Sequence, residues 1–150
     1  MRKSLYAMVL LSFIAVFAAN AQDYYLSKTI NGNYKEVVQK TKDVLKEQGF
    51  GVTTETQMDK VLKEKLDNVD MKPYLILGVC NPGFAYKTLQ AEPNIGLFLP
   101  CKVVVKQVDD SKVEVVMINP SEVMKNINNP DLDKVAAEVT KRFKEALSNL

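Results

Sequence analysis

The two cysteines are the residues of this chain with the most specific chemistry. Cys80 ends an apolar run and is followed by Asn81 and Pro82, and Cys101 lies further along. Asn81 is a favourable N-cap and Pro82 suits the first turn of a helix, so Cys80 should precede a helix N-terminus. The positive end of a helix dipole favours the thiolate, the form of cysteine that attacks disulfides and binds metals.

This cysteine pair allows three interpretations. The first is structural, either a disulfide in an oxidising compartment or two small buried thiols. The second is thiol-disulfide exchange, with Cys101 as the resolving partner of Cys80. The third is a soft-metal site. Two cysteines and no histidine argue against structural zinc, which needs four ligands.

We expect Cys80 and Cys101 to lie close enough to bridge. Cys80 ends one predicted strand and Cys101 lies early in the next, and a compact connector suits neighbouring antiparallel strands. Bridging requires Cα atoms within about 7 Å of each other. A disulfide closing a loop of about 20 residues would stabilise the fold by on the order of 3 kcal/mol in the chain-entropy model.

The predicted surroundings of the thiols are aromatic, amide and proline side chains. Aromatic residues at strand and helix spacings belong to the core more often than to a pocket, so this grouping is a candidate only. Tyr86 and Phe98 are further aromatic candidates for the same pocket. The candidate residues around the cysteines are Tyr74, Asn81, Pro82, Phe84 and Pro100.

No catalytic residue can be assigned from the pattern. The absence of histidine removes histidine triads, histidine acid-base chemistry and histidine metal ligation. No glycine-rich phosphate loop, nucleophile elbow or carboxylate dyad is recognisable, and no cofactor is expected. We therefore favour a non-enzymatic protein whose partner is a small molecule or another protein, and a homodimer stays open.

The first 21 residues have the order of a signal peptide. Arg2 and Lys3 are basic, an apolar run covers Leu5–Ala19, and Ala21 completes a small-residue cleavage pattern before Gln22. The run is shorter than the roughly 20 residues that span a bilayer, which argues against an uncleaved anchor. The expected product is a single domain, residues 22–150, in the periplasm or outside the cell.

The mature chain carries equal numbers of acidic and basic residues once Arg2 and Lys3 are removed. A neutral surface of mixed sign has no electrostatic footprint for nucleic acid or for an anionic membrane. We therefore expect the mature chain to bind neither nucleic acid nor a membrane.

Hydrophobic periodicity predicts an α+β domain with the order β-α-β(4)-α. An antiparallel, curved sheet should carry two long helices on one face, with Gly49 ending the first helix. Shorter helices are expected over 61–66 and 83–90. The predicted strands are Tyr24–Ile30, Phe50–Thr56, Tyr74–Cys80, Leu97–Val105 and Lys112–Ile118, and the long helices are Tyr34–Gln48 and Leu132–Leu150.

Several short motifs carry a family resemblance between about Tyr34 and Leu147. They are Gly49-Phe50-Gly51-Val52, Gly78-Val79-Cys80-Asn81-Pro82, Ala85, Ile95-Gly96, Leu99-Pro100-Cys101 and Asn119-Pro120. Together they resemble the domain-of-unknown-function family numbered 302. The resemblance implies a fold similar to the TATA-binding-protein-like class and implies no activity.

Two functional hypotheses follow. The first is a secreted binding module that holds a ligand or partner on the helix-free face of its sheet. The second is a thiol-disulfide redox or soft-metal-binding protein that uses Cys80 and Cys101. A very stable disulfide would favour the first, and a labile, oxidising one the second.

Overall fold

A five-stranded antiparallel sheet is the frame of the molecule. The computed structural model describes residues 24–150, so the predicted leader and its cleavage site lie outside the described residues. The strands run in the spatial order β1-β5-β4-β3-β2, which leaves β1 and β2 at the edges. Their bounds are Tyr25–Asn31 (β1), Gly51–Gln57 (β2), Tyr74–Cys80 (β3), Cys101–Gln107 (β4) and Lys112–Ile118 (β5).

Two long helices, α2 (Tyr34–Glu47) and α6 (Pro130–Ser148), cover one face of the sheet. Asn33 caps α2 by accepting a hydrogen bond from the Lys35 amide at 2.9 Å, and Gly49 ends the helix with φ +82°. A left-handed residue at this position favours glycine, as the sequence predicts. The α+β fold with a curved antiparallel sheet and two long helices is therefore confirmed.

The main core lies between this sheet and the two long helices. Alternate residues of β3, β4 and β5 point toward the helices and are almost wholly buried, as a sheet covered on one face requires. Phe143 of α6 is fully buried among them. The strand residues involved are Leu75, Leu77, Val79, Val103, Val105, Val113, Val115 and Met117.

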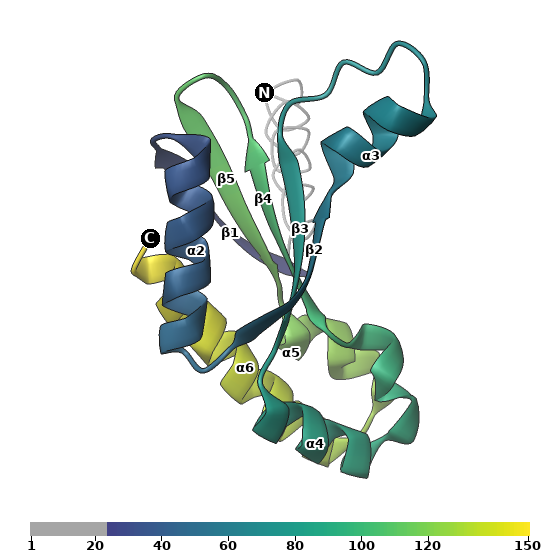
Figure 1. Cartoon of the computed structure of the whole chain (residues 1–150). Coiled ribbons are helices and arrows are strands. Elements are labelled where there is room, and N and C mark those ends of the chain that lie inside the picture. The colour runs from purple at the N-terminus through teal and green to yellow at the C-terminus, as the bar shows by residue number, and fades with distance from the viewer. Residues whose placement is uncertain (1–23) are drawn as a thin grey trace, which may run out of the picture.

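Shorter elements gather at the two ends of the sheet (Figure 1). The helix α3 (Met58–Lys65) and the β4–β5 turn lie at one end. At the other end, below the C-terminus of β3, lie α4 (Pro82–Ala91), the 3₁₀ helix η1 (Pro93–Phe98), α5 (Pro120–Val123) and the 3₁₀ helix η2 (Met124–Ile127). Among residues 24–150, no helix is both long and apolar enough to cross a bilayer.

The prediction of a strand from Leu97 was wrong at its start. Residues 93–98 form η1, and β4 begins only at Cys101. Pro93 opens the 3₁₀ helix and the Glu92 carboxylate accepts from the Asn94 amide at 3.0 Å, so this segment has its own cap. Leu97, the first residue of the predicted strand, is 88% exposed. The β2–β3 ladder has a register shift between Val52 and Thr54.

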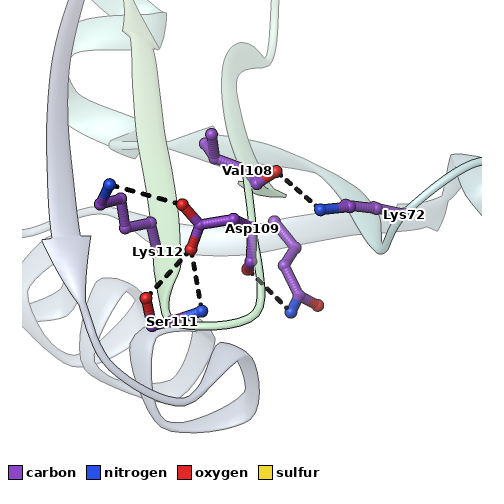
Figure 2. A network of polar contacts seen from close by, with 6 residues as sticks. Lys72, Val108, Asp109, Ser111 and Lys112 are labelled. Atoms are coloured by element: carbon purple, nitrogen blue, oxygen red, sulfur yellow. Dashed lines mark hydrogen bonds and ion pairs between the residues drawn. The ribbon is translucent and has the colours of Figure 1, made fainter.

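The β4–β5 turn is held by one carboxylate (Figure 2). Asp109 Oδ1 accepts from the Ser111 amide at 2.9 Å, and Asp109 Oδ2 lies 3.5 Å from Lys112 Nζ. Lys72 Nζ donates to the Val108 carbonyl at 2.9 Å. The hydrogen bond from Ser111 holds the pKa of the Asp109 carboxyl below its usual value. These contacts fix the hairpin at the end of the sheet opposite the cysteines.

Candidate functional site

An apolar cavity lies where the end of β3 meets the small helices. Cys80 and Cys101 contribute to its sheet side, Phe84 to the α4 side, and Leu132 and Ala136 to the α6 side. The enclosed volume is about 50 Å³, and the empty space including the open mouth is about 520 Å³. The enclosed part therefore accommodates only a few atoms, so a larger ligand has to extend through the mouth.

The lining of this cavity is almost free of polar groups. Among the lining residues that the structure describes, Asn81 and Thr88 supply the only amide and hydroxyl side chains, and none is charged. The Thr88 hydroxyl donates within its own helix, to carbonyls of Phe84 and Ala85 at 3.1 and 2.9 Å. A charged ligand group would find no counter-charge on these walls, whereas an apolar group would leave water at a gain in free energy.

Asn81 fixes the start of α4 against the end of α2. Its Oδ1 accepts from the Phe84 amide at 3.1 Å, which is the predicted N-cap, and its Nδ2 donates to the Gly49 carbonyl at 2.9 Å. Pro82 occupies the first turn of α4, also as predicted. One side chain thus links the helix that forms one wall of the cavity to the loop that precedes β2.

Arg142 supports the same wall from α6. Its guanidinium carbon lies 5.1 Å from the centroid of the Phe84 ring, within cation–π range, and Nη1 donates to the Gln48 carbonyl at 3.1 Å. Glu138 pairs with Arg142 Nε at 3.0 Å. Phe50 packs on Phe84 with centroids 6.3 Å apart. These contacts hold the Phe84 ring at the junction of α4, α6 and the sheet.

The expected disulfide is absent, and both cysteines are free thiols in the described structure. The register of β3 and β4 pairs Cys101 with Val79, not with Cys80. Neighbouring residues of a strand point to opposite faces, so this register does not place the two thiols side by side across the ladder. Both cysteines nevertheless line the same cavity, because Cys80 ends β3 where the chain turns into α4.

Burial raises the pKa of the Cys101 thiol to about 11, and nearby Cys80 adds to the rise while Lys102 opposes it. Desolvation disfavours the thiolate in an apolar environment, which explains the direction. Cys101 is therefore a poor nucleophile at neutral pH.

Pro100 and Gly78 explain how Cys101 is positioned. A Cβ on Gly78 would lie 2.6 Å from Pro100 Cγ and would also collide with the Thr54 hydroxyl. Only glycine lets the Pro100 ring lie against β3 at this point. Pro100 is not among the described residues that line the cavity. It affects the site only as the residue that directly precedes Cys101.

Tyr74 was wrongly grouped with the cysteines. It begins β3 and Cys80 ends it, and six steps of about 3.4 Å separate the two by roughly 20 Å. The Tyr74 amide donates to Asp59 of α3, at the opposite end of the sheet. Tyr86 also points away from the cavity, with 66% of its surface exposed, whereas Phe98 does line the cavity.

Sequence reasoning missed the second wall of the cavity. Ile95, Met124, Leu132 and Ala136 form a small buried cluster of their own, and all four line the cavity. Leu132 and Ala136 belong to the predicted helical stripe, but nothing in their spacing identifies the residues opposite them. Ile95 belongs to the family motif Ile95-Gly96, and Met124 belongs to no motif.

Comparison with known proteins agrees with this fold. The sequence model of the family described as "Domain of unknown function DUF302" matches residues 26–150. The chain belongs to the DUF302 family. The predicted resemblance, drawn from the cysteine and glycine motifs, is confirmed.

Two relatives place this DUF302 domain among uncharacterised proteins. The crystal structure of an uncharacterized conserved DUF302 protein from Bacillus stearothermophilus superposes with a TM-score of 0.77 at 31% identity, over 86% of this chain and 98% of the other. An uncharacterized protein of Aquifex aeolicus is 28% identical over 89 residues, which is 57% of this chain. The match spans 62% of the Aquifex protein's length.

Proposed function

We propose that this DUF302 domain is a non-catalytic binding protein that holds a small apolar molecule in the cavity between α4 and α6. The observation that carries the proposal is the composition of the walls, which contain no charged side chain among residues 24–150. Ligand sites are commonly concave and apolar with few polar groups, and Asn81 and Thr88 supply those few here.

The elements around the cavity support entry of a ligand. Phe98 of η1 lines the cavity and is 39% exposed, so it lies where the cavity meets solvent. The helix α4 has no buried residue, in contrast to α2 and α6. A segment with few buried apolar contacts is the easiest part of a fold to displace. A ligand larger than the enclosed volume would enter by moving α4 and η1.

The cavity differs in position from the ligand surface that the sequence suggested. The expected surface was the helix-free face of the sheet, whereas the cavity lies on the helical side, at the end of β3. Export from the cytoplasm stays part of the proposal, because the first 21 residues have the order of a signal peptide. Intact-mass measurement of exported protein, with a mature N-terminus at Gln22 expected, tests that part.

Thiol-disulfide exchange is the less favoured alternative. Exchange needs an attacking thiolate, and burial raises the pKa of the Cys101 thiol to about 11. The two thiols also stand on strand positions that are not directly opposed. Neither observation favours a catalytic redox couple.

Binding of N-phenyl-1-naphthylamine, an uncharged dye that fluoresces when it leaves water, tests the proposal. The dye should bind the purified chain. Ala85→Leu and Ala136→Leu should each weaken dye binding at least about tenfold, or ~1.4 kcal/mol. Both positions line the cavity, so each new leucine side chain would occupy space that the dye needs. Ala137→Leu is the matched control, since Ala137 follows Ala136 on α6 but is exposed.

Two outcomes would contradict apolar binding in the cavity. One is the absence of dye binding by the unmodified chain. The other is equal binding by the Ala85, Ala136 and Ala137 variants, which would move the dye to another surface. Far-ultraviolet circular dichroism of each variant establishes that the leucine is tolerated, because overfilling a core costs typically 1–3 kcal/mol.

A further inference from the structure

Three sulfur atoms belong to side chains that line one cavity. Cys80 and Cys101 reach it from neighbouring strands, and Met124 reaches it from the start of η2. Met124 is buried, and the two cysteines are partly buried. From this arrangement we propose that the cavity is a binding site for one cuprous ion, with the Cys80 and Cys101 thiolates and the Met124 thioether as ligands.

The donor set selects the cation. Thiolate and thioether are soft ligands that favour Cu(I) over hard cations such as magnesium or calcium, which require oxygen. Structural zinc is closed by four nitrogen, sulfur or carboxylate ligands. Among residues 24–150 no three histidine, cysteine or carboxylate side chains are grouped for a metal, so that set is missing here. Met124 therefore supplies the third ligand beside the two cysteines.

The walls of the cavity suit a cation that needs few ligands. Within the described part of the chain, Asn81 and Thr88 are the only lining side chains with oxygen, and both already take part in hydrogen bonds within the protein. The remaining walls are aliphatic and aromatic, so they exclude water and hard competing anions.

The complex would carry one negative charge, because two thiolates outnumber the single charge of Cu(I). Two cationic side chains lie nearby: Lys102 follows Cys101 directly, and Arg142 stacks on the Phe84 wall. Glu138 pairs with Arg142 and so reduces the contribution of Arg142 to balancing the negative charge of the complex. Binding converts two thiols to thiolates and releases two protons, with no change in the oxidation state of copper.

The ligands come from elements of different stiffness. Cys80 and Cys101 lie on interior strands, which the ladder holds in place. Met124 begins a four-residue 3₁₀ helix and has a flexible side chain, so it can adjust to a bound ion. The proposed site thus combines two fixed thiols with one adaptable thioether.

Competition with bathocuproine disulfonate, a coloured Cu(I) chelator, tests this site in the reduced, anaerobic protein. The chain should retain one Cu(I) per molecule at chelator concentrations that strip free copper. Cys80→Ser and Cys101→Ser should each lower the affinity at least about 100-fold, beyond the 10–100-fold typical of losing an outer-shell partner. Met124→Leu, which keeps the volume but removes the sulfur, should lower it about tenfold.

Met117→Leu is the matched control, because Met117 is fully buried in the main core and does not line the cavity. Its copper affinity should equal that of the unmodified chain. Complete loss of copper to the chelator by the unmodified chain would overturn the site. So would unchanged affinity in either cysteine variant, and unchanged affinity in Met124→Leu would overturn the three-sulfur ligand set.

This inference stands apart from the proposed apolar ligand. Dye binding without copper retention would leave the proposed function and remove the copper site. Copper retention without dye binding would do the reverse. Met117→Leu should keep both its dye binding and its copper binding, because Met117 belongs to the main core and does not line the cavity.

Discussion

The two hydrophobic clusters of this molecule are built on different plans. The main core joins the sheet to α2 and α6, and its strand residues are almost completely buried. The second cluster, Ile95, Met124, Leu132 and Ala136, lies under the small helices and has only four buried residues. The adjoining elements α4 and η1 carry large apolar side chains that are exposed to solvent. These exposed residues are Tyr86, Leu89, Leu97 and Phe98.

This difference separates stability from function. A large, fully buried core supplies most of the free energy of unfolding, because that energy grows with apolar surface removed from water. A small cluster with an exposed cover contributes less and can open at lower cost. The cavity lies between the two, with one wall from each. We therefore expect substitutions in the first cluster to unfold the chain and substitutions in the second to act mainly at the site.

The largest expected effect belongs to the main core. Phe143→Ala should lower the free energy of unfolding by about 3 to 5 kcal/mol, because it leaves a cavity where a fully buried ring packs against Phe50 with centroids 4.8 Å apart. Lys141→Ala, on the exposed side of the same helix, should change it by less than about 0.5 kcal/mol. Urea unfolding measures both, and equal small losses would remove the contrast between the clusters.

In the second cluster, Ile95→Ala should cost about 2 kcal/mol, at the low end for a buried isoleucine, because the small helices can relax around it. Hydrogen exchange should quicken in α4 and η1 but not in the second half of α6. Leu97→Ala is the control two residues away, where the side chain is 88% exposed and little change is expected. Faster exchange throughout the sheet after Ile95→Ala would show that the clusters unfold as one unit.

The junction between the clusters can be tested at Gly78. Gly78→Ala should cost about 1 to 3 kcal/mol, because the new methyl group collides with Pro100 and Thr54 and pushes Cys101 out of place. Gly96→Ala adds a methyl group where nothing lies within 4 Å and should be nearly neutral. Thermal unfolding compares the two, and an equally neutral Gly78→Ala would show that Pro100 does not hold β4.

The smallest effect is expected at the far hairpin. The pKa of the Asp109 carboxyl is held below its ordinary value of 3.8, mainly by the Ser111 amide, so its contribution exists above that value and is lost as the pH falls through the lowered pKa. Asp109→Ala should lower the melting temperature slightly at pH 6 and not at pH 2. Asp110→Ala removes the same charge from the next residue, and an equal shift for both variants would refute a specific role for Asp109.

Elements whose patterns are local and repeated follow from the order of the amino acids. The stripe of α6, the apolar run of β3, the Asn81 cap and the end of α2 at Gly49 are all as predicted, because each depends on residues only a few positions apart. The cysteine and glycine motifs also determined the family. Local pattern failed at Leu97 and Phe98, which were predicted to begin a strand. They instead end a 3₁₀ helix that Pro93 opens and Glu92 caps.

The residues that face the cysteines depend on the packing of the whole domain. The register that pairs Cys101 with Val79 depends on the whole β3–β4 ladder, and a shift by one residue would exchange the faces of every side chain. Ile95, Met124 and Leu132 meet the thiols only because α6 returns across the end of the sheet. Contacts between residues so far apart in the chain leave no periodic signal in the sequence, so the cavity and its sulfur atoms emerge only from the folded chain.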